Sequence, residues 1–558
     1  MSDTRRRRRA PRLENSGHVT SDVQTPTTDR PAAPAGRRRF RALANAIIER
    51  PYLITAGLIG LIIVTGVNGP DWPAQYFRTW LIRDHGTYLW NNQWYGGHLL
   101  PGYSILAPVI ASKIGTATLT ALSCVTSAWA WDKLRVGAND FARQVGSCWF
   151  AVMCSVDYLI GRTPFALGVA AGMLAILAAR RRHPLWAGFA ALLCGLSSPL
   201  SGAFLMLVAL AWVPRERVWP TRLCFAPAAL GLVAALAFPN EGMFPFPWWR
   251  FLPILAFAAV GLAILPKELA SARRFLWLYA ATAVIFFFVP TSLGGNLARL
   301  GELTSGPLMA VVLLSAGRRR LVVLLSLPLL VWQFQSAALA ITHDIKDSPG
   351  EKPQYYAGML DYLQKNNTHP LGRVEIPFTR GHWESVFVAE KMPLARGWER
   401  QLDRNYNAVL YQEDLTVEEY RDWIDDTGVR FVALPDIPID PSAIPEAELI
   451  RKGIPWLKPV YTEKDGRWQI WEVENPSPIV EGPGELTELT PSRFSFDAHS
   501  AGTFVVKIHP TFWVTADRPE IVIKATKDEW SEITVDRPGP VTVSARDAKL
   551  FKGKGNKP

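Results

Sequence analysis

Residues 303–341 read LTSGPLMAVVLLSAGRRRLVVLLSLPLLVWQFQSAALAI, in which three consecutive arginines separate two apolar runs. An α-helix needs roughly 20 predominantly apolar residues to cross the hydrocarbon core of a bilayer, and the second run meets this length. An arginine cluster between two such runs is typical of a turn on the cytoplasmic side. The stretch therefore predicts a membrane-spanning helical hairpin, and it gives the pattern to look for elsewhere in the chain.

Apolar runs of the same kind occupy most of residues 46–342. The whole chain is 49% hydrophobic with 22 tryptophans, an average that combines one strongly apolar region with polar regions on either side. We expect an α-helical polytopic membrane domain over residues 46–342 with about eleven spans. The expected spans are 52–69, 102–131 with a bend near Gly115, 144–160, 163–180, 184–197, 199–213, 222–238, 250–265, 274–290, 303–316 and 320–341, where 184–213 is alternatively a helical hairpin with short arms.

The connections between these spans form two sets that differ in positive charge. Every second connection is basic, and this set reads DKLRVGANDFAR, RRRHP, PRERVWPTR, PKELASARR and AGRRR. The other connections, such as SSPLS and PTSLGGNLARLGE, carry few basic residues. Because lysine and arginine concentrate in cytoplasmic loops, we expect the N-terminus inside. The first loop (residues 70–101) and everything after about His343 are then expected outside.

The ends of the chain and its cysteines limit the possible functions further. Residues 1–45 contain two arginine clusters around a segment rich in Ser, Thr, Pro and Ala, which predicts a disordered basic cytoplasmic tail. Its place just before the first span favours contact with anionic membrane lipid over nucleic-acid binding. All five cysteines lie in the apolar region, so they are expected to be small buried hydrophobic residues rather than disulfides or zinc ligands.

The polar C-terminal part is expected to hold two extracytoplasmic domains. Residues 343–477 alternate helical and strand patterns, such as LDYLQKN followed by GRVEIPF, which predicts a small α/β domain. Residues 478–550 contain short β runs such as RFSFDA and PVTVSA between turn residues, which is typical of a β-sandwich. Residues 551–558 form a basic tail.

With this topology, the outer loops bring together residues that suit transfer of a sugar. Asp71 follows the first span directly, and its carboxylate suits a base that takes the proton from an attacking hydroxyl. Arg299 and Arg162 lie at the outer ends of spans, where arginine can hold a phosphate in bidentate fashion, and Asn296 lies beside Arg299. No glycine-rich phosphate loop is present for a nucleotide sugar. The expected donor is therefore a polyprenyl-phosphate-linked sugar.

The first loop also has an unusual density of aromatic and hydrogen-bonding side chains. Their expected role is a substrate platform, with an interfacial aromatic belt as the alternative for the tryptophans. Gly96 and Gly97 allow a tight turn or a close approach to a ligand. His85 and His98 lack a third ligand at metal spacing, so a metal site is not indicated. The predicted platform residues are Trp72, Gln75, Trp90, Trp94, Tyr95 and His98.

Several motifs resemble those of a known group of membrane proteins. The stretch from D71-W-P-A-Q to L-W-N-N-Q-W-Y-G-G-H98 looks like that of the bacterial YfhO-like or "6-pyruvoyl-tetrahydropterin synthase-related" membrane family. The same holds for G161-R-T-P-F165, P393-L-A-R-G-W-E-R-Q-L-D403, Y420-R-D-W and G428-V-R-F-V-A-L-P435. An aspartate in the first outer loop, many spans and an outer C-terminal domain also resemble the GT-C superfamily of glycosyltransferases. The chain departs from its relatives at Gln75, where they often have histidine.

This resemblance implies an inverting glycosyltransferase in the bacterial plasma membrane. It would use a lipid-linked sugar as co-substrate, with no other cofactor, and a cell-envelope glycan or glycolipid as acceptor. Two other classes remain open. A transporter of an envelope precursor would show internal repeats and a midplane site, and the sequence halves show no self-similarity. A non-catalytic envelope-assembly protein would work through its C-terminal β domain.

Overall fold

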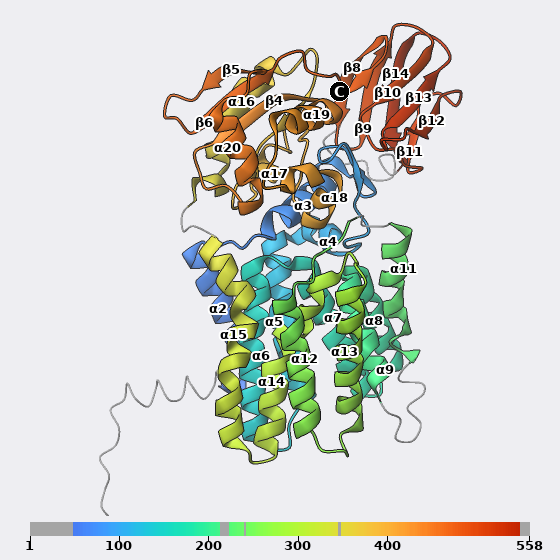
Figure 1. Ribbon diagram of the computed structural model, residues 1–558. Coiled ribbons are helices and arrows are strands. Elements are labelled where there is room, and N and C mark those ends of the chain that lie inside the picture. The colour runs from blue at the N-terminus through green and yellow to red at the C-terminus, as the bar shows by residue number, and fades with distance from the viewer. Residues whose placement is uncertain (1–47, 213–222, 239–241, 344–347, 547–558) are drawn as a thin grey trace, which may run out of the picture. The chain divides into compact units, whose positions relative to one another are not determined.

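The computed structural model describes residues 48–212, 223–238, 242–343 and 348–546 (Figure 1). The tail at residues 1–45, the basic connection at 214–222 and the tail at 551–558 therefore lie outside the described residues. The first part is mainly helical, with one two-residue pair of strands in the first loop. Its elements are α2 (Tyr52–Thr65), α3 (Trp72–His85), β1 (Trp90–Asn91), β2 (His98–Leu99), α4 (Ala107–Ile114), α5 (Thr116–Leu134), α6 (Asp140–Ile160), α7 (Thr163–Arg180), α8 (Pro184–Ser197), α9 (Pro199–Ala211), α11 (Ala229–Ala237), α12 (Trp248–Ile264), α13 (Ala270–Phe288), α14 (Ala298–Ser315) and α15 (Arg319–His343).

Four of the described helices are long and apolar enough to cross a membrane: α7, α13, α14 with the preceding turn, and α15. The pair α4 and α5 makes a fifth if it is counted as one bent span. Other apolar helices, among them α2, α8, α9 and α12, have only 10–17 residues. At 1.5 Å per residue, a 14-residue helix covers about 21 Å of a core that is about 30 Å thick. The described helices thus include four or five that are both long and apolar enough to span a membrane, and a bundle of all eleven expected spans is not shown.

Two local features of the helical region match the sequence prediction. The run 102–131 breaks at Gly115, where the backbone takes a φ of 89° and the axes of α4 and α5 differ by 112°. Residues 184–211 form the pair of short arms expected as the alternative, α8 and α9, with only Ser198 between them. Pro199 begins α9, and because proline disfavours a helical residue before it, Ser198 has extended φ and ψ angles.

Hydrogen bonds join basic connections to basic ones and less basic connections to one another. Arg180 donates from Nη1 to the Leu134 carbonyl over 2.5 Å, and the Ser315 hydroxyl oxygen accepts a bond of 3.0 Å from the Ala138 backbone N–H. These bonds link three of the basic connections. The less basic connections are joined by Gly69 N–H to Leu159 O, Ile105 N–H to Leu196 O and Phe244 N–H to Thr291 O. Figure 1 shows the long helices side by side between these two sets of loops.

The polar part begins with a four-stranded mixed sheet in the order β3-β4-β6-β5. β3 pairs in parallel with β4, and the other pairs are antiparallel. Helix α19 ends at Gly428, whose φ of 67° is a left-handed conformation that glycine adopts without strain, and β4 follows at once. The elements are α16 (Ala357–Asn366), β3 (Arg373–Glu375), α17 (Glu384–Phe387), α18 (Arg400–Tyr406), α19 (Val417–Thr427), β4 (Val429–Pro435), α20 (Ile444–Lys452), β5 (Leu457–Thr462) and β6 (Trp468–Val473).

Two four-stranded antiparallel sheets follow, ordered β12-β13-β10-β7 and β11-β14-β9-β8. Their inner faces share one hydrophobic core, in which the rings of Phe496 on β9 and Phe504 on β10 lie 5.2 Å apart. This arrangement is a small β-sandwich. The strands are β7 (Val480–Glu481), β8 (Gly484–Thr490), β9 (Arg493–Ala498), β10 (Gly502–Val506), β11 (Val514–Ala516), β12 (Val522–Ala525), β13 (Ser531–Val535) and β14 (Gly539–Ala545).

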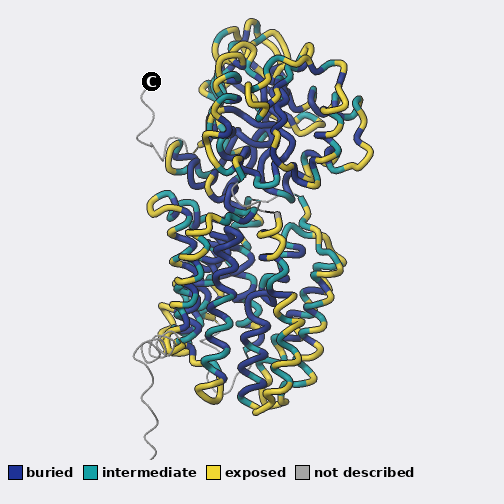
Figure 2. The backbone as a smooth tube through the Cα atoms, turned by 90° about the vertical axis from the view of Figure 1, so that its left-hand side faces the viewer, coloured by how far each residue is buried: buried dark blue, intermediate teal, exposed yellow. Residues whose placement is uncertain are grey.

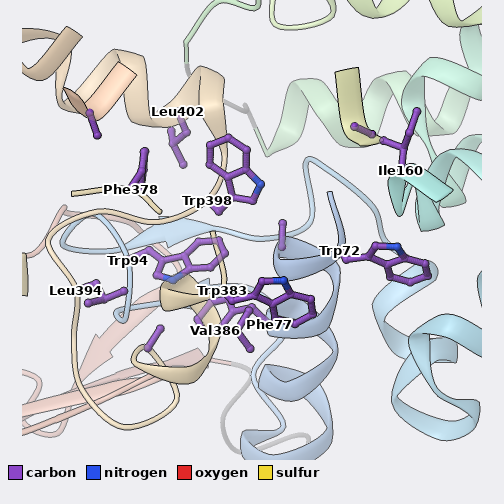
Figure 3. Close-up of a cluster of buried hydrophobic side chains, with 14 of the residues drawn as sticks. Trp72, Phe77, Trp94, Ile160, Phe378, Trp383, Val386, Leu394, Trp398 and Leu402 are labelled. Atoms are coloured by element: carbon purple, nitrogen blue, oxygen red, sulfur yellow. The ribbon is translucent and has the colours of Figure 1, made fainter. Parts of the chain in front are cut away.

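One hydrophobic core connects the first loop with the helices and the mixed sheet. It includes Phe77 on α3, Trp94 in the loop, and Phe378 and Leu402 from the polar part. Figure 2 shows buried backbone in both the helical region and the sheets, and Figure 3 shows these side chains gathered beside α3. The loop at residues 70–101 is therefore a structural junction, because it packs against elements on both sides of it in the sequence.

Candidate functional site

Asp71 is held at the start of α3 by the backbone of the residues that end α6. Its N–H donates to the Ile160 carbonyl over 3.0 Å, and the N–H of Gly69 donates to the Leu159 carbonyl over 2.9 Å. A Cβ at Gly69 would lie 2.6 Å from the Ile160 Cα, so this close approach requires glycine. Asp71 occupies the N-cap position of α3, yet its side chain makes no capping hydrogen bond. A helix cap therefore does not explain its carboxylate.

The structure brings Arg299 to Asp71, although 228 residues separate them in the sequence. Nη2 of Arg299 lies 3.9 Å from Oδ2 of Asp71, and the two side chains are 16% and 27% exposed. The guanidinium also lies over the Phe165 ring, at 5.6 Å from the centroid. Among the described residues no other ion pair with Arg299 is found, and 3.9 Å is too long for a hydrogen bond. Donors on Arg299 thus remain free for a ligand, and Asn296 lies half-buried in the short turn before α14.

Arg162 lies deeper in the protein and is paired with two carboxylates. Its Nη1 lies 3.3 Å from Oδ1 of Asp157 and 3.6 Å from Oε2 of Glu302, and all three side chains are buried. The Ser336 hydroxyl donates to the Glu302 carboxylate at 3.2 Å. Burial alone would lower the pKa of Arg162, but Glu302 and Asp157 outweigh it and raise that pKa. Direct phosphate binding, predicted from the sequence, is thus less suited to Arg162 than to Arg299.

Two further residues belong to this site, and Tyr103 was not singled out by the sequence. Burial raises the pKa of the Tyr103 phenol, and so does the charge of Asp71. Arg250, in the first turn of α12, interacts electrostatically with Glu302, Arg162 and Asp71. We define the outer site as Asp71, Tyr103, Asp157, Arg162, Arg250, Arg299 and Glu302. No sequence spacing could have identified Tyr103, because the turn after the first loop places it there.

The mixed-sheet domain reaches the outer site through the segment LARGWERQLD. The Trp398 indole N–H donates to the carbonyl of Pro70, the residue before Asp71, over 2.6 Å. Glu399 forms a buried ion pair with Arg78 on α3. The guanidinium of Arg78 lies over the Tyr103 ring at 4.1 Å. Both the base candidate and Tyr103 are therefore held in place by a segment about 300 residues further along the chain.

The aromatic side chains predicted as a platform are packing residues in the structure. Trp94 is fully buried, donates from Nε1 to the Ser385 carbonyl over 3.0 Å and stacks on Phe77 at 4.0 Å between ring centroids. The Tyr95 hydroxyl accepts from the Glu399 N–H over 3.0 Å. A buried ring presents no open face on which a sugar could stack. The rings of Trp94 and Tyr95 therefore do not form the predicted open platform.

The other predicted platform residues are also buried, each in a different environment. Trp72 packs on Tyr158 and leaves no space for a Cβ at Gly161, so it fixes the turn between α6 and α7. Gln75 is buried on α3. The Trp90 indole donates to Asn92 over 2.6 Å and belongs to the core of the β-sandwich. The burial of these side chains depends on contacts with distant segments, which composition alone does not reveal.

No group of three or more His, Cys, Asp or Glu side chains in the described ranges has a geometry that could hold a metal ion. The chemistry available in the outer site is instead that of a carboxylate beside arginines. A carboxylate can accept a proton from a hydroxyl, and guanidinium groups can stabilise a leaving phosphate. The phenol of Tyr103 adds a hydrogen-bond donor near Asp71.

Comparison with known proteins does not assign the chain to a family or a function. No protein-family model matches the chain, and no curated protein sequence matches it.

Proposed function

We propose that this protein is an integral membrane glycosyltransferase of the GT-C type. It would move a sugar from a polyprenyl-phosphate donor to an extracytoplasmic glycan or glycolipid in a bacterial envelope. The observation that carries the proposal is the pair Asp71 and Arg299 at 3.9 Å, a base without a capping role beside an arginine with free donors. The motifs that resemble the GT-C and YfhO-like proteins point to the same class.

The proposed reaction is a single displacement with inversion at the anomeric carbon. Asp71 accepts the proton of the acceptor hydroxyl, whose oxygen forms the new bond to the anomeric carbon. The bond from that carbon to the phosphate oxygen breaks, and its electron pair remains on the polyprenyl phosphate. Arg299, together with Arg250, stabilises the added negative charge. Arg162 contributes indirectly by pairing with Asp157 and Glu302, which fixes the position of α14.

The arrangement of loops supports the proposed topology. The first loop is bonded to the polar part, for example by the Asn92 N–H to the Pro491 carbonyl over 2.8 Å. This bond supports placing both on one side of a membrane, as the distribution of arginines predicts. Three of the basic connections are joined to one another by hydrogen bonds. We propose a cytoplasmic N-terminus, extracytoplasmic C-terminal domains and about eleven membrane segments, in which the short helices pair as re-entrant or thin spans.

The direct test is transfer by full-length protein in lipid nanodiscs, supplied with polyprenyl-phosphate sugars and an envelope glycan fraction as acceptor. Asp71→Asn should lower the transfer rate by about 10²–10⁴, the usual contribution of general base catalysis, and should leave donor binding and the melting temperature unchanged. The matched control is Asp84→Asn on the same helix, an exposed carboxylate paired with Arg83. Full turnover by Asp71→Asn would refute the assignment of the base. Absence of transfer by the wild-type protein with every donor would favour an assembly protein or a transporter.

A further inference from the structure

Phe512 is an exposed aromatic side chain on the loop between β10 and β11 of the β-sandwich. It is 65% exposed, the neighbouring Trp513 is half-buried, and the centroids of the two rings lie 4.3 Å apart. A single apolar residue on a surface needs no explanation, so the position of this pair is what matters. Trp513 stacks on Phe238, with 5.3 Å between the ring centroids and 27° between the ring planes. The pair is thus joined to the residue that follows α11.

Helix α11 carries an apolar surface that the rest of the described chain leaves uncovered. Its sequence is ALGLVAALA, without a polar side chain. Leu230, Val233 and Leu236 are all exposed, and their spacing of three residues places them along one face of the helix. A helix that is apolar on every side is buried in a protein core or in a membrane. The exposed face of α11 therefore supports contact with lipid.

The connection between α11 and α12 has aromatic residues at both ends. Phe238 follows the last residue of α11, and the exposed Trp248 and Trp249 begin α12. Tryptophan and tyrosine concentrate at the headgroup level of membrane proteins. This connection belongs to the less basic set, which the proposed topology places outside. In that topology the Phe238 ring, and with it Trp513, lies at the level of the outer headgroups.

A separate contact joins the same end of the β-sandwich to the first loop. Strand β11 pairs with the last residues of β14, at the end of the sheet where β8 turns into β9. The Asn92 side-chain amide of the first loop donates to the Thr490 carbonyl at this turn over 3.0 Å. The predicted platform residue His98 forms no open surface in the loop, because it is 3% exposed and stacks on Trp94. The exposed Phe512 ring therefore lies at the end of the sandwich that contacts the first loop.

A positive charge lies beside the aromatic pair. The backbone N–H of Arg546 donates to the Trp513 carbonyl over 2.8 Å, and the Arg546 side chain is exposed. Within the described part of the chain, no carboxylate forms an ion pair with it. A guanidinium can hold a phosphate oxygen, and anionic headgroups attract basic residues near a bilayer surface. Aromatic rings with an adjacent arginine therefore match the headgroup region of a bilayer.

We propose that the β-sandwich docks on the outer leaflet of the membrane through Phe512. The Phe512 ring inserts among the lipids, Trp513 and Phe238 fix its depth, and Arg546 contacts the phosphate of an anionic phospholipid. This contact goes beyond the proposed transfer reaction, because none of these residues belongs to the outer site. It uses the proposed membrane topology and can be measured without turnover.

The test places the photoreactive residue p-benzoylphenylalanine at Phe512 of the full-length protein, in nanodiscs of phosphatidylethanolamine and phosphatidylglycerol. This replacement keeps an aromatic ring at the position. Irradiation should attach a phospholipid to the peptide that contains residue 512, as mass spectrometry of the digested protein would show. The matched control carries the same residue at His499, which is exposed and follows β9 at the opposite end of the sheet. The control should carry no lipid adduct.

A second measurement reports depth without photochemistry. Phe512→Cys and His499→Cys, each in a chain whose five native cysteines are replaced by alanine, carry a nitroxide spin label. The label at 512 should collide more with oxygen, which concentrates in lipid, and the label at 499 more with a water-soluble nickel chelate. Asp71→Asn should change neither result, so failure of the transfer proposal is distinguishable. The proposal is overturned if residue 512 gives no lipid adduct, if it crosslinks to a second copy of the chain instead, or if the two labels are equally accessible to nickel.

Discussion

Two clusters of arginine and carboxylate side chains in this protein differ in the length of their ion pairs and in how far their side chains are exposed to solvent. In the outer site, the pair Arg299 and Asp71 is 3.9 Å long, with 16% and 27% of the side chains exposed. In the mixed-sheet domain, Arg396 lies 2.7 Å from Asp403 and 3.2 Å from Glu446, and these side chains are at most 2% exposed. We call Glu375, Arg396, Asp403 and Glu446 the sealed cluster. Arg396 pairs with all three carboxylates, so the role of this cluster is to hold the domain together.

The difference indicates where a ligand can act. The Arg396 guanidinium already donates to both Asp403 oxygens and to Glu446, and it lies 3.7 Å above the Phe378 ring. A phosphate would have to displace all of these contacts. Arg299 has no comparable set of bonds among the described residues, and water can reach it. Mutations in the sealed cluster should therefore change stability most, and mutations in the outer site should change activity.

The largest expected loss of stability is that of Arg396→Met. The change leaves three carboxylates, Glu375, Asp403 and Glu446, buried without their cation. Breaking a buried ion pair by removing one partner typically costs about 3–5 kcal/mol. The melting temperature of full-length protein in detergent should fall well below that of the wild type. Arg404→Met, an exposed position on the same helix as Asp403, should melt normally. Equal melting of the two variants would contradict the role assigned to the sealed cluster.

A smaller, pH-dependent effect is expected from Glu375→Gln. Burial, followed by repulsion from Glu446, raises the pKa of Glu375 well above its usual value. The folded protein therefore binds this proton more tightly than the unfolded chain does. Its contribution to stability is fully present below the usual glutamate pKa and is lost as the pH rises through the raised pKa. Glu375→Gln lacks this loss, so its melting temperature should gain on the wild type as the pH rises. Glu448→Gln, exposed on α20, should follow the wild type at every pH.

The sequence predicts features that neighbouring residues determine, and it does not predict features that depend on contacts between segments far apart in the chain. The bend at Gly115 and the strand Val429–Pro435 are local, and the pattern VRFVALP identifies that strand. The order of the spans places Asp71 and Arg299 at the same end of the helices, which is why both could be singled out. Their distance of 3.9 Å comes from how α14 packs beside α6, and no local pattern contains it.

The role of the aromatic residues in the first loop, in contrast, could not be predicted from the sequence. A tryptophan in an interfacial belt, in a substrate platform or in a domain junction has the same sequence neighbours. What buries Trp94 is Gly397, where a Cβ would lie 2.3 Å from the indole ring. That contact spans about 300 residues, so only the folded chain reveals it. Composition also cannot separate short apolar helices from helices long enough to span a membrane, and only four or five of the described helices are of the second kind.

The contact between the mixed-sheet domain and the outer site gives an intermediate prediction. Trp398→Phe removes the N–H that donates to the half-buried Pro70 carbonyl and should cost about 0.5–1.5 kcal/mol, the net contribution of a typical hydrogen bond. Because Pro70 precedes Asp71, the transfer kcat should also fall while the KM for the donor stays unchanged. Trp186→Phe, at a residue that is 68% exposed, is the matched control. A variant that loses stability but keeps its full kcat would show that this bond does not position Asp71.

The smallest change in stability is expected for Arg299→Gln. An ion pair of 3.9 Å with partly exposed partners contributes about 0–1 kcal/mol, so the melting temperature should remain close to that of the wild type. In the proposed reaction, activity should respond in the opposite way, because glutamine keeps hydrogen-bonding groups but lacks the charge that would stabilise a leaving phosphate. We expect weaker donor binding together with a large loss of transfer. Arg274→Gln, at an exposed position on α13, should keep both. If Arg299→Gln instead lowers the melting temperature as much as Arg396→Met does, the two clusters have the same structural role. The assignment of the outer site as a catalytic site would then be wrong.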